Sequence, residues 1–190
     1  MSEPADWPAL IGMMIILKSD IDRADPDHLQ DYDLPRIRAV ESELLDIEGN
    51  LDIVLPSCYR EFLLHANGWS AFYWNTDLFG TVEFNGGGAA QVAWESIDIF
   101  ESEAVLGDVG LSASQVVPIG AGIGSENLFL LVRPTVPDLG GNVVWISGGD
   151  SVEVYRDFVD FFSYMIEMHQ IILDELHAKH GIINGADDDD

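Results

Sequence analysis

Residues 55–69, with the sequence LPSCYREFLLHANGW, decide the fold of this chain, because they form one short amphipathic pattern with a defined start and stop. Pro56 suits the first turn of a helix, where a missing N–H has no cost, and Gly68 suits the left-handed conformation that ends one. We therefore predict a helix over Leu55 to Asn67. Its buried stripe has three- and four-residue spacing and consists of Tyr59, Phe62, Leu63 and Ala66.

Three other stretches have the apolar spacing of a helix. Trp7 to Ser19 predicts a helix packed on the domain, and the segment from about Asp157 to His180 predicts a closing helix. A further helix is expected to begin at Pro35. The face that it would bury consists of Ile37, Val40, Leu44 and Leu45.

Short apolar runs between these helices predict strands. Alternation places strands around Thr81 to Phe84 and Gln91 to Trp94, separated by glycines 86–88. Ile97 to Leu106 fits either an irregular or a helical segment. Four later runs have the spacing of an antiparallel meander: Gln115 to Ile119, Leu128 to Arg133, Val143 to Ser147 and Val152 to Tyr155.

Helices, then strands, then one helix predict an α+β domain, with an antiparallel sheet and flanking helices. We expect an N-terminal helix and acidic linker over 1–33, the domain over 34–183, and a disordered acidic tail over 184–190. Ala9 to Leu17 is too short to cross a bilayer and follows acidic residues, so no membrane anchor or signal peptide is expected.

The order Leu-Pro, Tyr, Phe-Leu and Asn-Gly within residues 55–68 resembles the signature of the SUKH superfamily, the Smi1/Knr4-like proteins. Val116 to Gly120 resembles the family's strand before a Gly-rich turn, and Asp157 to Phe162 resembles its closing helix. The resemblance extends from Leu34 to about Met168. In one departure, Ser125 follows the last glycine of the turn, where the family usually has Asp. The resemblance implies the same α+β architecture.

The chain is strongly acidic: 34 Asp and Glu against 8 Lys and Arg give a formal net charge of -26. Such a field repels DNA, RNA and anionic lipid, so we expect neither nucleic acid nor a membrane as a partner. No Lys or Arg occurs between Arg60 and Arg133, and this acidic span would attract a basic protein. Solvation, or adaptation to high intracellular salt, is the alternative, and it predicts acidity on all faces rather than on one.

No arrangement of residues predicts catalysis, a cofactor or a metal site. Gly120 to Gly124 lies between two predicted strands and lacks the following helix of a phosphate loop, so we interpret it as a turn. The histidines of the last helix match no zinc motif, and the carboxylates are too numerous to single out a catalytic pair. Cys58 is the single cysteine, which excludes an internal disulfide and fits a reducing, cytoplasmic compartment.

The resemblance implies a bacterial immunity protein that binds and neutralises a cognate polymorphic toxin, often a nuclease or deaminase. An acidic surface fits this role, because toxins that act on nucleic acid tend to be basic at the active cleft. The alternatives are a regulatory or scaffold protein of the Smi1/Knr4 type and an undetected enzyme. Aromatic residues at 69–74 fit either the core or an interface. The residues expected to contact the partner are Trp69, Trp74, Glu95, Asp98, Glu101 and Glu103.

Overall fold

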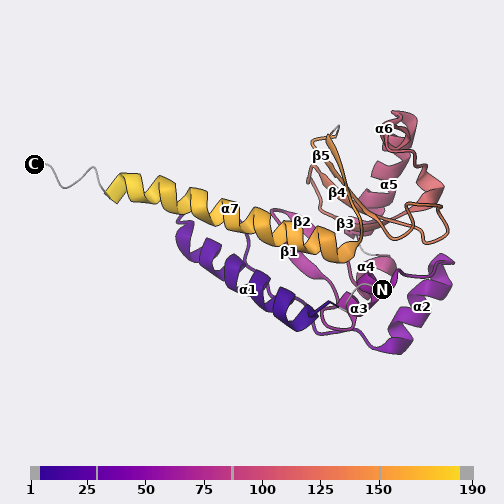
Figure 1. Ribbon diagram of the computed structural model, residues 1–190, viewed down its shortest axis with the longest axis horizontal. Helices are drawn as coiled ribbons and strands as arrows, with labels where there is room; N and C mark the ends of the chain where they lie inside the picture. Colours follow the sequence, from indigo (N-terminus) through magenta and orange to yellow (C-terminus); the bar gives the residue numbers. More distant parts are fainter. Residues whose placement is uncertain (1–4, 29, 87, 150, 185–190) are drawn as a thin grey trace, which may run out of the picture.

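The computed structural model of the protein describes residues 5–28, 30–86, 88–149 and 151–184 (Figure 1). Its helices are α1 (Trp7–Ala24), α2 (Glu41–Leu51), α3 (Ser57–Leu63), α4 (Thr81–Phe84), α5 (Gly88–Ser102), α6 (Val105–Asp108), the 3-10 turn η1 (Ala113–Gln115) and α7 (Phe158–Asn184). Its strands are β1 (Trp69–Tyr73), β2 (Thr76–Leu78), β3 (Val116–Ala121), β4 (Asn127–Val132), β5 (Val143–Ser147) and β6 (Ser151–Tyr155).

Within the described residues, six strands form one antiparallel sheet in chain order, β1-β2-β3-β4-β5-β6. The α+β class and the antiparallel meander predicted from the last four strands are therefore confirmed. The predicted turn at Gly120 to Gly124 is also confirmed in outline, because β3 ends at Ala121 and a tight turn leads into β4. Among the helices of the described segments, none is long and apolar enough to span a bilayer.

Strand β4 shows why helices cover both faces of this sheet. Phe129 and Leu131 point into a core that they share with α1, α3 and α7, whereas Leu128 and Leu130 point into a second core with α5 and α6. Successive side chains of a strand lie on opposite faces, so a strand buried on both sides needs a continuous apolar run. The β4 sequence NLFLLV is such a run.

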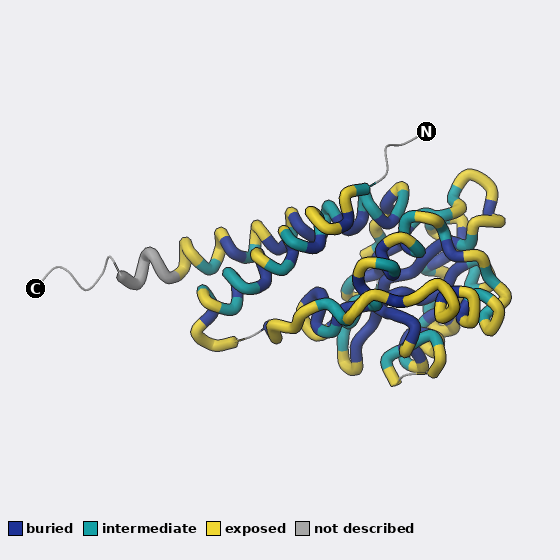
Figure 2. Tube along the Cα trace, turned by 90° about the horizontal axis from the view of Figure 1, so that it is seen from below, coloured by how far each residue is buried: buried dark blue, intermediate teal, exposed yellow. Residues whose placement is uncertain are grey.

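Helices α1 and α7 lie side by side and form an arm that extends away from the sheet (Figures 1 and 2). They run in the same direction, because Trp7 at the start of α1 packs on Phe158 and Phe162 at the start of α7, with ring centroids 5.7 and 5.5 Å apart. Both helices confirm the sequence prediction and are longer than expected. The expected tail over residues 184–190 lies outside the described residues, except for Asn184 at the end of α7.

Two segments predicted as strands are helices instead. Thr81–Phe84 forms α4, and residues 91–94 lie inside α5. The strand prediction was wrong because each alternating run is too short to distinguish a period of 2 from one of 3.6. In α5 the buried residues recur at helical spacing and pack against the second core: Ala90, Ala93 and Ile97. The ambiguous segment after them is helical, in α5 and α6.

The helix expected from Pro35 begins only at Glu41. Before it, the backbone N–H of Arg36 donates to the carbonyl oxygen of Gly68 at 3.0 Å, which holds this segment extended against the loop after α3. Of the four residues predicted to form the buried face of this helix, Leu44 alone is buried. The other three are exposed, Ile37 at 90%, Val40 at 55% and Leu45 at 59%.

Strands β1 and β2 were not predicted from the sequence. Their alternation is hidden by a register shift within β1, and by positive φ angles of 47° at Ala71 and 51° at Trp74. Non-glycine residues adopt this conformation rarely, so propensity does not point to it. This irregular hairpin places Trp69 in the core and Trp74 at a turn.

Candidate functional site

The signature segment builds the scaffold of the domain. All four residues of the predicted stripe are buried, as expected: Tyr59, Phe62, Leu63 and Ala66. The Tyr59 hydroxyl donates to the carbonyl oxygen of Phe79 at 2.7 Å. The helix itself is shorter than predicted and ends at Leu63, because the chain makes an irregular turn through Ala66 before β1.

Asn67 and Gly68 have separate structural roles. The Asn67 side chain accepts from the backbone N–H of Thr81 at 2.8 Å and donates to the Thr81 hydroxyl at 2.8 Å, which fixes the start of α4. Gly68 has a φ of 82° and turns the chain into β1. An added Cβ at Gly68 would lie 2.6 Å from the backbone nitrogen of Gly80. The signature thus specifies packing and hydrogen bonding of the fold.

Ser125, at the departure from the family pattern, also has a structural role. Its hydroxyl lies 2.6 Å from the hydroxyl of Thr76 and accepts from the backbone N–H of Asn127 at 3.1 Å. A side-chain oxygen at this place in a turn is the usual way to satisfy a following backbone N–H. Ser125 can therefore supply the acceptor that an Asp would supply.

The outward side of α5 combines acidic side chains with an exposed tryptophan. Glu95, Asp98 and Glu101 are exposed and lie on one side of the helix, because their spacing is three residues. Trp94 is 36% exposed beside them. Glu103 is exposed just beyond the end of the helix.

A shallow groove of about 380 Å³ lies along this acidic helix face, between α4 and α5. Trp94, Glu95 and Asp98 line it from α5, and Glu83 and Phe84 line it from α4. Glu83 forms an ion pair with Arg36 at 2.7 Å, whereas within the described residues no ion pair engages Glu95 or Asp98. Within the described residues no cation therefore neutralises Glu95 or Asp98, and the apolar indole surface of Trp94 lies beside them.

The profile of the SMI1 / KNR4 family (SUKH-1) matches residues 38–164. The chain belongs to the SUKH-1 family. The match begins in the extended segment before α2 and ends inside α7, so it includes the whole sheet and leaves α1 outside. It agrees with the resemblance read from the signature segment. A comparison with curated proteins found no significant match.

The structure of this SUKH-1 domain separates the residues that we expected to contact a partner. Trp69 is fully buried, and its Nε1 donates to the carbonyl oxygen of Asp33 at 2.7 Å, so it is a core residue and no contact residue in this conformation. Trp74 is 39% exposed in the turn between β1 and β2. It packs on Tyr73, whose ring contacts Trp145 on the face of the sheet that α7 covers.

Trp74 and the α5 acids therefore belong to opposite layers of the SUKH-1 domain, and the structure does not bring them together. It brings Trp94 to the acids instead. Sequence reasoning missed Trp94 because residues 91–94 were interpreted as a strand. A helical interpretation would have placed Trp94 one turn from Asp98.

A buried polar cluster joins the α1–α7 arm to β1. The Lys18 ammonium donates to the carbonyl oxygen of Ala71, and burial lowers the pKa of Lys18 to about 8. His169 Nε2 lies 3.1 Å from the carbonyl oxygen of Phe72 and Nδ1 lies 2.7 Å from that of Met165. Burial lowers the pKa of His169 to about 4, and the nearby Lys18 charge acts in the same direction. These contacts stabilise the irregular part of β1.

No metal site emerges within the described segments, where no group of three or more His, Cys, Asp or Glu side chains could hold an ion. Cys58 is half-buried, and burial together with the Asp157 charge raises the pKa of its thiol. A raised pKa leaves less thiolate, which is the reactive form.

Proposed function

We propose that this SUKH-1 protein is an immunity protein, which binds and neutralises a cognate polymorphic toxin by protein–protein contact in the cytoplasm. The toxin would be a nuclease or deaminase with a basic surface. The observation that carries the proposal is the α5 face, where Glu95, Asp98 and Glu101 lie beside the Trp94 groove. Binding without catalysis is sufficient for this role.

Negative charge and an aromatic anchor residue both favour this face as a docking surface. Unpaired carboxylates attract a basic partner over long range and accelerate encounter, and most strongly at low ionic strength. Tryptophan is a frequent hot-spot residue at protein interfaces, because one ring buries much apolar area at little cost in side-chain entropy. The groove beside Trp94 offers a concave surface to a partner's side chain.

Acidity alone does not distinguish this face. Exposed acids also lie on the outer side of α7, among them Glu167, Asp174 and Glu175, as general solvation would predict. What separates α5 from α7 is the combination of carboxylates with a half-exposed indole and a groove. We therefore assign the docking surface to α5, with Glu103 at its end, and keep Trp74 as an anchor candidate on a separate surface.

The deciding experiment is coexpression with the products of the neighbouring genes. Each neighbour is expressed in a susceptible host with the wild-type chain, with the Trp94→Ala variant, or alone. Restored growth with the wild-type chain and reduced rescue by Trp94→Ala would support the proposal. Toxicity without rescue by the wild-type chain would contradict it and would favour a regulatory or scaffold protein of the Smi1/Knr4 type.

A further inference from the structure

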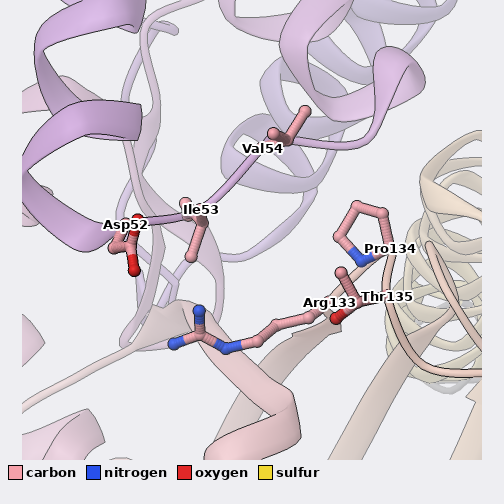
Figure 3. Close-up of a pocket in the computed structure, with 6 residues that line it drawn as sticks. All are labelled: Asp52, Ile53, Val54, Arg133, Pro134 and Thr135. Atoms are coloured by element: carbon pink, nitrogen blue, oxygen red, sulfur yellow. The ribbon is translucent and has the colours of Figure 1, made fainter.

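A second pocket lies between the end of α2 and the end of β4 (Figure 3). Its volume is about 460 Å³, which is in the range of small-molecule sites. Its lining residues are Asp52, Ile53, Val54, Arg133, Pro134 and Thr135. In Figure 3 the Arg133 side chain extends toward the segment of Asp52 and Ile53, and its guanidinium lies below both of these side chains in the view.

Arg133 is a half-buried cation whose guanidinium has no partner among the described residues. No hydrogen bond or ion pair of its guanidinium occurs within the described part of the chain, and its Nε is buried without an acceptor. The other half-buried arginines are both paired, Arg36 with Glu83 at 2.7 Å and Arg60 with Glu41 at 2.6 Å. A buried charged donor without an acceptor lowers stability. An unpaired guanidinium is therefore unexpected in a chain with so many carboxylates that could accept from it.

We propose that this pocket binds a carboxylate carried on a short aliphatic stem. A guanidinium presents parallel N–H groups that match the two oxygens of a carboxylate. The apolar walls of the pocket, Ile53, Val54 and Pro134, suit the carbon stem. The ligand thus supplies the acceptor that Arg133 lacks and buries apolar surface in the same step.

The surrounding charges select a singly charged ligand. Arg133 is the one basic residue among the six that line the pocket, and Asp52 carries a negative charge at its edge. The chain as a whole has a net charge of -26, which opposes a dianion such as phosphate more strongly than a monoanion. Asp52 is not close enough to form an ion pair with Arg133, but its field weakens carboxylate binding.

Two kinds of molecule carry a carboxylate on a short aliphatic stem: a free aliphatic acid, and a polypeptide that ends in an aliphatic residue. The probes are therefore 3-methylbutanoate for the free acid and N-acetyl-leucine for the chain end. The neutral amide 3-methylbutanamide has the same stem and serves as the control ligand. Each is titrated into the full-length, isotope-labelled protein, and the NMR signals of Arg133 Nε–H and of the Ile53 and Thr135 amides are followed.

Both carboxylates are expected to shift these signals to saturation, whereas the amide shifts them weakly and without saturation. The acid with the lower dissociation constant identifies the source. Arg133→Gln is expected to weaken binding at least 10-fold. Arg133→Lys is expected to weaken binding less, because lysine keeps the positive charge but lacks the paired N–H groups of the guanidinium. Asp52→Asn is expected to tighten binding several-fold. Arg38→Gln removes an exposed arginine that forms no ion pair with any described residue, and it is expected to leave binding unchanged.

The proposal fails if neither carboxylate saturates the wild-type signals. It also fails if the amide binds as tightly as the acids, or if Arg133→Gln retains binding while its spectrum shows a folded protein. None of these readouts depends on a toxin, so the pocket and the docking surface of α5 are tested separately.

Discussion

Arg36 and Glu83 form a two-point ion pair, in which Nη1 and Nη2 of the guanidinium each lie 2.7 Å from one carboxylate oxygen. The pair joins the extended segment before α2 to the start of α4. Arg36 Nε also donates to the carbonyl oxygen of Asn67 at 2.8 Å, and Glu83 accepts from the backbone N–H of Gly80. These contacts hold the loop after α3, helix α4 and the α4 side of the groove in one arrangement.

Glu83→Gln is expected to lower the free energy of unfolding by about 2 kcal/mol, because an amide cannot accept both guanidinium hydrogen bonds and leaves Arg36 partly unpaired. Urea unfolding followed by tryptophan fluorescence measures the loss. Glu103→Gln is the matched control, since Glu103 is exposed and forms no ion pair within the described residues. Equal unfolding midpoints for the two variants would show that the pair contributes nothing.

Gly68→Ala is expected to destabilise the fold by roughly 3 kcal/mol or more. An added Cβ would lie 2.6 Å from the backbone nitrogen of Gly80 and 2.8 Å from the carbonyl oxygen of Leu78, and backbone cannot move aside cheaply. Gly124→Ala separates this clash from backbone strain, because Gly124 has a φ of 73° with open space around it. It should cost only about 1–2 kcal/mol. Thermal unfolding of both variants tests the difference, and equal losses would exclude the clash.

The fold is expected to lose stability on acidification through His169. Its pKa is lowered from 6.5 to about 4 in the folded protein, so the unfolded chain takes up a proton over this interval and the folded chain does not. Stability therefore falls as pH drops from about 6.5 to 4, by roughly 3 kcal/mol in total from this group.

Urea unfolding of the wild type and His169→Gln at several pH values in this interval isolates the effect. The variant is expected to show a shallower slope of stability against pH, whatever its stability at pH 7. An unchanged slope in His169→Gln would disprove the assignment.

Neutralising the α5 surface is expected to slow association with the proposed toxin partner. The variant carries Glu95→Gln, Asp98→Asn, Glu101→Gln and Glu103→Gln. Its association rate at low salt should fall about 10-fold or more, and its salt dependence should flatten, because steering acts on encounter. Stopped-flow mixing with the toxin measures both. The control variant neutralises the α7 acids Glu167, Asp174 and Glu175 and should behave as the wild type.

Trp94→Ala is expected to weaken the complex about 10-fold or more, mainly through faster dissociation, since the indole would be lost from the buried centre of the interface. Surface plasmon resonance on the purified pair gives the rates. Trp74→Ala provides the comparison because Trp74 has a similar exposed fraction on the opposite layer. Weakening by Trp74→Ala alone would move the interface to the β1–β2 turn.

Much of the fold was predictable where one strong pattern governs a segment. The stripe of α3 and the long apolar spacing in α7 have a helical period that the local sequence reveals. Strands β3, β4 and β5 are recognisable as short continuous apolar runs, because they are buried on both faces. The predictions failed where the period is short or where the partner lies far away in sequence. Residues 36–39 look helical, but hydrogen bonds to the loop after α3 hold them extended.

The candidate site was predicted only in part for the same reason. Composition identified the acidic span and with it Glu95, Asp98 and Glu101, but not the helix face that these residues share. Which tryptophan lies beside them depends on whether residues 91–94 are helix or strand. That choice is made by the packing of Ala90, Ala93 and Ile97 on the second core.

The sequence by itself determined the family, the α+β class and the charge, because these follow from local spacing and composition. Tertiary structure decided which aromatic side chains are buried, because burial depends on contacts between segments far apart in the chain. Trp69 and Trp94 are equally apolar, yet the hairpin of β1 and β2 places one in the core and helix α5 exposes the other. Arg133 is a candidate site because the fold places the end of α2 beside the end of β4 and leaves the guanidinium without an acceptor among the described residues.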